Sequence, residues 1–396
     1  MKKNTVKYII VCVLTCLIVS VPFSLMANVS DLRLTNIRKM AMGNAGVAIS
    51  NDETALYNNP AGLMNVKGLN IKAPRLRGGF NSSFVDRISE LSDMSESSGD
   101  DNEALQNLKT LVPMQMVFEF GSDPLLSVVM EGLGFGLFSG GQIISSLKDK
   151  ITPTLKAEGA VDVVPAVGYA TGVEILGNEC AVGISAKYIS RSAMYDKISG
   201  DEVYTLNQAD LLKQINDKPD KKGTPDFFNL GGFGLDLGLL TSIDFLGKGN
   251  FGIAVHNLGA ALTGTKRIVD GNDVEIENRD VTNTLPVTCV LGLGVESNLP
   301  DYLLGEFVGD FTMAADYKIV SPYDSFFKNL HMGIEKKLMG GLVTLRGGLN
   351  QGIIVGGLGL DLVVLHLDYA YFAEELGEEI GVDQIDYHVV QLGVLF

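Results

Sequence analysis

The feature that most constrains this chain is an alternation of apolar residues with glycine or polar residues, repeated along most of its length. Between positions 285 and 295 the odd-numbered residues are apolar, while glycine or threonine occupies most even positions. Residues 233–239 and 363–371 show a similar period of two. Because successive side chains of a strand point to opposite faces, each segment is predicted to be a two-faced β-strand.

A soluble β-sandwich also alternates, so three further features decide between a sandwich and a membrane barrel. The segments run for about ten residues or more, which is enough to cross a bilayer when tilted. Their apolar faces are nearly pure, and almost every segment repeats the pattern, which leaves no opposing sheet for a core. In lipid only a helix or a closed barrel satisfies every backbone polar group. We therefore predict an all-β fold, a transmembrane β-barrel of about fourteen antiparallel strands.

The first 27 residues are predicted to be a secretory signal. Lys2, Lys3 and Lys7 precede an apolar run over residues 8–26, and cleavage is expected near Ala27. The alternative is a retained membrane anchor, because the run is about long enough to span a bilayer. Pro22 and the small residue at Ala27 favour cleavage.

Charge and cysteine content exclude several classes of protein. The chain has 31 Lys and Arg against 47 Asp and Glu, and three of the lysines lie in the predicted signal. Such an acidic surface repels nucleic acid, so no nucleic-acid partner is expected. Only Cys180 and Cys289 remain after the signal, and two buried thiols are favoured over one disulfide.

The connections between predicted strands alternate in length. Long connections cover residues 83–111, 197–229, 264–283 and 374–386, whereas most of the others have only a few residues. Outer-membrane barrels have short periplasmic turns and longer external loops, so the long connections are expected outside the cell. Their carboxylate runs indicate a solvated surface, with capture of divalent cations as the minor alternative. The amphipathic segment 204–216 could be a ligand-capture site or the small core of a lid.

Residues 28–66 precede the strands and are rich in turn-forming residues, as in NDETALYNNPAGL at positions 51–63. A plug inside a barrel cannot join the ladder of the wall, so short side chains and turns must satisfy its backbone. We predict residues 28–66 to be an N-terminal hatch that plugs the lumen, and residues 67–396 to be the barrel. Among the polar residues expected to point inward are Lys318, Arg346, His366 and Asp368. They could form structural ion pairs, or some of them could line a passage and bind a ligand's carboxylate, with Arg346 and Lys318 as the first candidates.

Three short motifs resemble the hatch of FadL-type outer-membrane fatty-acid transporters, and they resemble the PorV-like branch of that superfamily more closely. The motifs are GNAGVA at residues 43–48, ALY at residues 55–57 and NPAGL at residues 59–63. Residues 367–378 (LDYAYFAEELGE) and a last strand ending in Phe396 match as well. The resemblance implies a fourteen-stranded barrel, a gating hatch and a wall opening at a kink in the third strand. Carried over to this chain, the hatch gate is Asn58, Asn59, Pro60, Ala61 and Gly62, and the lateral opening is Ser139, Gly140 and Gly141. The paired glycines could instead pack against the hatch.

The resemblance implies an outer-membrane channel for passive uptake of hydrophobic small molecules such as long-chain fatty acids, gated by the hatch. The alternative is a non-transporting scaffold that holds secreted or surface proteins, as in PorV-like relatives, and a third possibility is an open hydrophilic porin. The expected partners are a hydrophobic ligand, outer-membrane lipid and the barrel-insertion machinery, which would read the terminal Phe396. The barrel is expected to be a monomer. The fatty-acid-binding residues of the family are not identifiable here, so the substrate stays open.

No enzymatic activity, cofactor or metal site is predicted. The four histidines lack metal-ligand spacing. His388 would project outward from the last strand, but no nucleophile motif accompanies it, and a barrel lipase would need a serine, a histidine and an orienting acid or amide together.

Overall fold

The computed structural model describes residues 32, 34–84, 86–87, 101–175, 177–216, 225–244, 248–270, 272–297, 311–320, 325–362, 364–377 and 380–394. The predicted signal, residues 1–27, and the terminal Phe396 lie outside the described residues. So do parts of the long connections 83–111, 197–229, 264–283 and 374–386.

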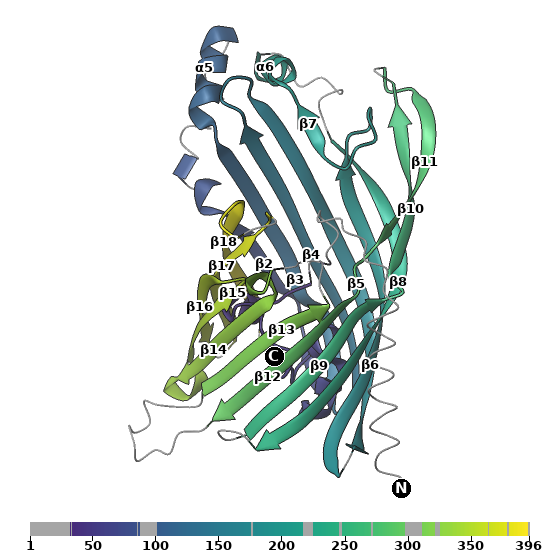
Figure 1. The fold of residues 1–396 in the computed structure, drawn as a ribbon, viewed down its shortest axis with the longest axis vertical. Coiled ribbons are helices and arrows are strands. Elements are labelled where there is room, and N and C mark those ends of the chain that lie inside the picture. Colours follow the sequence, from purple (N-terminus) through teal and green to yellow (C-terminus); the bar gives the residue numbers. More distant parts are fainter. Residues whose placement is uncertain are drawn as a thin grey trace.

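Fourteen antiparallel strands close into a barrel, as the period-two pattern predicts. They are β2 (Arg75–Phe80), β3 (Met114–Met130), β4 (Leu133–Lys148), β5 (Thr154–Ile175), β6 (Asn178–Tyr195), β8 (Asp226–Asp244), β9 (Lys248–Leu258), β12 (Thr288–Ser297), β13 (Phe311–Val320), β14 (Leu330–Leu338), β15 (Val343–Asn350), β16 (Ile353–Asp361), β17 (Leu365–Glu375) and β18 (Gln384–Val394). Each pairs with the next around the ring, and β18 pairs with β2 to close it. Closure removes every free sheet edge from the wall (Figure 1).

The first wall strand is interrupted near Pro74. A short strand, β1 (Asn70–Lys72), and β2 both pair with β3, and residues 73–74 separate them. Opposite this gap, the register between β3 and β4 shifts between Ser122 and Leu126. We call residues 123–125 the wall break, because they pair with neither neighbouring strand in the ladder.

The long connections carry their own secondary structure. They contain α5 (Asp101–Leu111), β7 (Tyr204–Leu206), α6 (Gln208–Asn216) and a hairpin of β10 (Ala261–Val269) with β11 (Glu275–Thr284). Figure 1 shows α5, α6 and this hairpin at the same end of the barrel. Leu206 and Leu211 are buried in one cluster with Leu108 and Leu111, so segment 204–216 contributes to a small hydrophobic core of these loops. Two short 3-10 helices, η4 (Phe327–Asn329) and η5 (Met339–Gly341), lie in the connections flanking β14.

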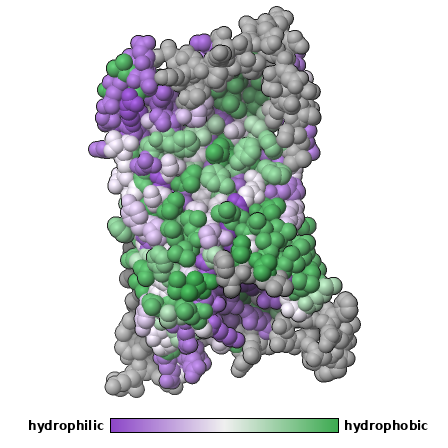
Figure 2. All heavy atoms as spheres, turned by 180° about the vertical axis from the view of Figure 1, so that it is seen from behind, coloured by the Kyte–Doolittle hydropathy of each residue, from purple (hydrophilic) through white to green (hydrophobic). Residues whose placement is uncertain are grey.

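The outer face of the wall is apolar. Large hydrophobic side chains that alternate along the strands are exposed, among them Phe233, Leu293, Ile334 and Ile354. Hydrophobic residues gather in a broad band over the middle and lower part of the face in Figure 2. An apolar belt of this kind is what the hydrocarbon of a bilayer requires, and the architecture is that of an outer-membrane barrel. None of the described helices is long and apolar enough to cross a membrane.

Both cysteines that follow the predicted signal are free thiols; Cys289 is buried, as expected, whereas Cys180 is only partly buried. Cys180 lies on β6 and Cys289 lies on β12. Engineered cysteines can therefore be introduced after these two are replaced.

The substitution Leu293→Lys tests the lipid-facing assignment. Leu293 is 51% exposed on the outer face of β12, so a lysine there must enter hydrocarbon. Such a charge near the bilayer midplane is expected to destabilise the barrel, reducing its free energy of unfolding by about 2–4 kcal/mol. Urea unfolding in lipid vesicles, followed by the gel shift of the folded barrel, measures this loss. The control is Thr282→Lys on β11, which adds the same charge at an exposed hairpin position and is expected to be neutral. Equal stability of the two variants would contradict the assignment.

Candidate functional site

The N-terminal segment, residues 34–66, lies inside the barrel. It contains α2 (Ile37–Ala41), α3 (Ala55–Asn58) and the 3-10 helix η1 (Pro60–Asn65). Asp316 on β13 accepts hydrogen bonds at Oδ2 from the backbone N–H groups of Gly46, at 2.7 Å, and Val47, at 3.0 Å. These bonds and the glycine contacts below join the segment directly to the inner face of the wall.

The asparagine-rich turn satisfies its own backbone, as its composition predicts. Asn59 caps η1, because its Oδ1 accepts from the Ala61 N–H at 3.2 Å. Its Nδ2 donates to the carbonyls of Val47, at 2.9 Å, and Leu239 on β8, at 3.2 Å. Pro60 fits the first turn of η1, where a missing N–H is harmless. The predicted gate residues therefore form one compact turn held against the wall.

Two other residues of the predicted gate fix the same turn from its sides. Asn58 accepts a hydrogen bond at Oδ1 from Lys39 Nζ at 2.7 Å. Gly62 approaches Ser50 so closely that a Cβ at this position would lie 2.4 Å from the Ser50 carbonyl oxygen. Burial lowers the pKa of the Lys39 ammonium to about 8. A gating role for this turn remains a prediction.

Glycines on the inner face allow the wall backbone to touch the N-terminal segment. A Cβ on Gly238 of β8 would lie 2.1 Å from Asn59 Oδ1, and one on Gly183 of β6 would lie 2.3 Å from the Pro60 carbonyl carbon. On β12, a Cβ on Gly294 would lie 2.5 Å from Ile49 Cγ2. The same holds for Gly292, Gly333 and Gly348, which face residues 42–48. The N-terminal segment therefore packs against the glycine-rich inner face of the strands.

Three of the four predicted lumen residues belong to one ion-pair network. Arg346 donates from Nε to Glu335 at 2.8 Å and pairs through an Nη with Asp368 at 2.7 Å. His366 also contacts Asp368. Arg38 of the N-terminal segment forms two bonds to Glu335, each of 2.9 Å. In this structure Arg346, His366 and Asp368 thus pair with one another, and Arg346 shares Glu335 with Arg38 of the segment.

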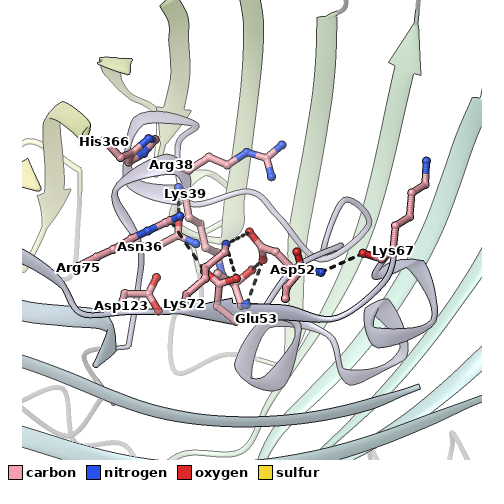
Figure 3. Close-up of polar contacts among 12 residues, drawn as sticks. Asn36, Arg38, Lys39, Asp52, Glu53, Lys67, Lys72, Arg75, Asp123 and His366 are labelled. Atoms are coloured by element: carbon pink, nitrogen blue, oxygen red, sulfur yellow. Dashed lines mark hydrogen bonds and ion pairs between the residues drawn. The ribbon is translucent and has the colours of Figure 1, made fainter. Parts of the chain in front are cut away.

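The N-terminal segment is also tied to the wall break. Tyr57 donates its hydroxyl to Asp123 Oδ2 at 2.8 Å, within residues 123–125. Lys72 on β1 contacts Glu53 and lies 4.0 Å from an oxygen of Asp52. Arg75 lies 3.9 Å from Glu53, and Figure 3 shows these groups converging between the segment and the wall. The segment and the interrupted part of the ladder are therefore in direct contact.

The predicted lateral opening lies beside the wall break. Ser139, Gly140 and Gly141 on β4 pair regularly with β5, and on the other side they pair with residues 120–122 of β3. Ser139 is the last of the three before the shifted register. A Cβ on Gly141 would meet the Phe120 ring at 2.7 Å, so this glycine packs against a neighbouring strand. The irregular strand is β3, and a lateral opening at Ser139, Gly140 and Gly141 on β4 stays a prediction.

A cavity of about 220 Å³ lies in the lumen between the N-terminal segment and the inner face of the wall. Lys39, Tyr57, Asp316, Lys318 and His331 are among its lining residues, together with apolar groups from both segment and wall. Lys318 is thus the one predicted lumen residue of the four that lines this cavity. The volume is below the roughly 300–1,000 Å³ of sites for drug-sized ligands. It suits a small molecule or the polar end of a longer one.

One contact on the outer face was missed by sequence reasoning. Ser82 Oγ lies 2.9 Å from His388 Nε2, and His388 Nδ1 lies 2.7 Å from the Tyr369 hydroxyl. Asp386 contacts Ser82 rather than His388, whereas a hydrolytic triad places its acid on Nδ1 of the histidine. Ser82 follows β2 and is about 300 residues from His388, so no local motif could have revealed the contact. Among the described residues, no group of three or more potential ligands could hold a metal ion.

The substitution Gly238→Val tests whether the N-terminal segment rests on the wall. The new side chain would displace Asn59, and such overpacking is expected to cost about 1–3 kcal/mol. We expect weaker seating of the segment and a larger ion conductance of the purified barrel in a planar bilayer. Gly347→Val is the matched control, because a Cβ at Gly347 meets no atom within 4 Å. If both variants kept the parental conductance and stability, the described contact at Gly238 would be wrong.

Comparison with known proteins identifies the fold. Neither the scan against protein-family models nor the search of curated proteins found a match. Among solved structures, a TodX monoaromatic hydrocarbon channel mutant aligns over 90% of this chain and 96% of its own, with a TM-score of 0.50 and 14% identity. The Ralstonia pickettii toluene transporter TbuX covers 92% and 100%, with a TM-score of 0.44 and 13% identity. A Pseudomonas aeruginosa FadL homologue covers 91% and 97%, with 0.40 and 10%.

At this level of identity the likeness to TodX establishes the fold alone, and it does not distinguish a PorV-like branch. The chain has the fold of the FadL-type outer-membrane channels.

Proposed function

We propose that this protein is a passive outer-membrane channel for hydrophobic and amphipathic small molecules, with its N-terminal segment as the hatch. The observation that carries the proposal is the cavity of about 220 Å³ inside a closed, lipid-facing barrel, bounded by that segment. The fold likeness to TodX, whose description is a monoaromatic hydrocarbon channel, points to the same class of function.

The proposed route starts among the long loops and reaches the cavity. Beyond it, the N-terminal segment sits directly on the wall, so passage requires the segment to move. Its bonds from Tyr57 to Asp123 and from Glu53 to Lys72 link that movement to the wall break. We therefore place sideways release at residues 123–125, next to Ser139, Gly140 and Gly141.

One observation favours the scaffold alternative. The β10–β11 hairpin projects from the loop end, and among the described strands β11 pairs with β10 alone. Val274 and Ile276 at this hairpin are 60% and 67% exposed. A strand with one unpaired edge and exposed apolar residues can accept a strand from another protein. A surface partner would bind there without using the lumen, so the two functions separate experimentally.

A reversible tether tests the channel and its hatch together. A Cβ on Gly294 of β12 would lie 3.2 Å from the Cβ of Ala48 in the N-terminal segment. Disulfides need about 3.5–4.5 Å between Cβ atoms, and the Cβ at position 294 would also lie 2.5 Å from Ile49 Cγ2, so the variant includes Ile49→Ala to make room. The variant carries Ala48→Cys and Gly294→Cys, with Ile49→Ala, Cys180→Ala and Cys289→Ala. We expect uptake of labelled hydrophobic compounds to stop in the oxidised state and to return on reduction.

The single variant Ala48→Cys in the same background is the control, and it should transport in both redox states. The reduced double variant shows whether the barrel folds. Uptake that continues through the tethered barrel would contradict gating by the N-terminal segment. No uptake above a strain lacking the protein, in any state, would reject the channel and favour the scaffold.

A further inference from the structure

We infer that the lumen cavity recognises a neutral hydroxyl group, so that the channel prefers alcohols or phenols with an apolar body over bare hydrocarbons and carboxylates. The inference rests on the proposed function and names its substrate class. It starts from two buried hydrogen-bond acceptors that lie side by side on the wall.

Asp316 on β13 and His331 on β14 are directly paired across the two strands. Both residues line the cavity and each is only 2% exposed. Oδ2 of Asp316 is used by the backbone N–H groups of Gly46 and Val47. Its Oδ1 has no hydrogen-bond partner within the described part of the chain.

His331 presents a second free acceptor, and its surroundings fix its protonation. Nδ1 lies 3.0 Å from the Gly43 carbonyl oxygen and 2.9 Å from Asn350 Oδ1, so it must carry the proton. The Asn350 amide is oriented by its Nδ2, which donates to the Ala373 carbonyl at 2.7 Å. In neutral His331, Nε2 is therefore an acceptor, and among the described residues nothing donates to it.

A third acceptor belongs to another strand of the barrel wall. Glu119 on β3 lines the same cavity, pairs with Arg77 through Oε1, and leaves Oε2 without a partner in the described structure. Buried acceptors are normally satisfied, and such exceptions point to a group that occupies the site. The cavity therefore calls for a ligand that donates hydrogen bonds.

The lysines of the cavity decide which donor fits. Lys39 and Lys318 line it as well and are themselves donors. A carboxylate would accept from them but would leave Asp316 and His331 unmet, and an ammonium would be repelled by them. A hydroxyl donates one hydrogen bond, which either Asp316 or His331 can accept, and it also accepts one from a lysine, so it serves both kinds of group. A single hydroxyl on a small apolar body also suits a volume of about 220 Å³.

Equilibrium dialysis of the purified full-length protein in detergent, with the same detergent on both sides, tests the inference. The probes are 1-naphthol, 1-fluoronaphthalene and 1-naphthoate, which share a ring system and differ in the polar group. The chain has no tryptophan, which keeps the protein background low when probe fluorescence is read. We expect 1-naphthol to bind about tenfold more tightly than 1-fluoronaphthalene, the gain from one well-placed hydrogen bond.

Asp316→Asn places a donor where the free acceptor stood and should reduce this preference to about twofold. His331→Gln is the second variant in case the first does not fold, and it should also reduce the preference. Ser185→Ala, which changes a buried polar residue of β6 outside the cavity lining, should leave it unchanged.

Equal binding of 1-naphthol and 1-fluoronaphthalene would overturn the inference, and so would tightest binding of 1-naphthoate, which would indicate anion recognition by the lysines. Binding of none of the three would also overturn it and leave water as the occupant. These results do not depend on uptake, so they are distinguishable from failure of the tethered-barrel test, which addresses the channel itself.

Discussion

The structure depends on the requirement that no backbone polar group faces lipid unpaired. A sheet meets this requirement in a bilayer only by closing on itself. Closure turns every second side chain outward into hydrocarbon and creates an interior that must be filled or left as water. This chain fills much of it with its own N-terminal segment. That segment cannot join the wall's ladder, so its asparagines and turns satisfy its backbone locally, as Asn59 does for Ala61 and Val47.

Two kinds of inward residue make the filled lumen possible. Glycines such as Gly238 and Gly183 bring wall backbone within van der Waals reach of the turn at residues 58–62. Charged residues then fix the segment by ion pairs, as Arg38 does with Glu335. Separating Arg38 from Glu335 would leave this buried carboxylate with Arg346 alone, so the pair helps to hold the segment in place. The contacts of Tyr57 and Glu53 at the wall break are different, because they lie where the ladder is already interrupted.

The sequence predicts the barrel well, because alternate residues of each wall strand face lipid and lumen and therefore alternate in polarity. Period-two alternation and loop lengths anticipate the fourteen strands. The turn-forming residues of this region predict the compact turn at residues 58–62. Contacts between distant strands escape sequence reasoning. Arg346 and Lys318 both look like inward cations, yet only Lys318 lines the cavity, while Arg346 is used by Glu335 and Asp368. The pairing of Asp316 with His331 and the approach of Ser82 to His388 likewise follow from strand register and not from any local motif.

The central claim is that the N-terminal segment, residues 34–66, is folded inside the lumen when no ligand is present. Hydrogen–deuterium exchange of the purified barrel, read by mass spectrometry at the amides of Gly46, Val47, Ala61 and Gly62, tests it most directly. Each of these amides donates a hydrogen bond and lies in the buried part of the segment. The account predicts protection comparable with that of the wall strands. Exchange at the rate of an unstructured peptide would contradict it.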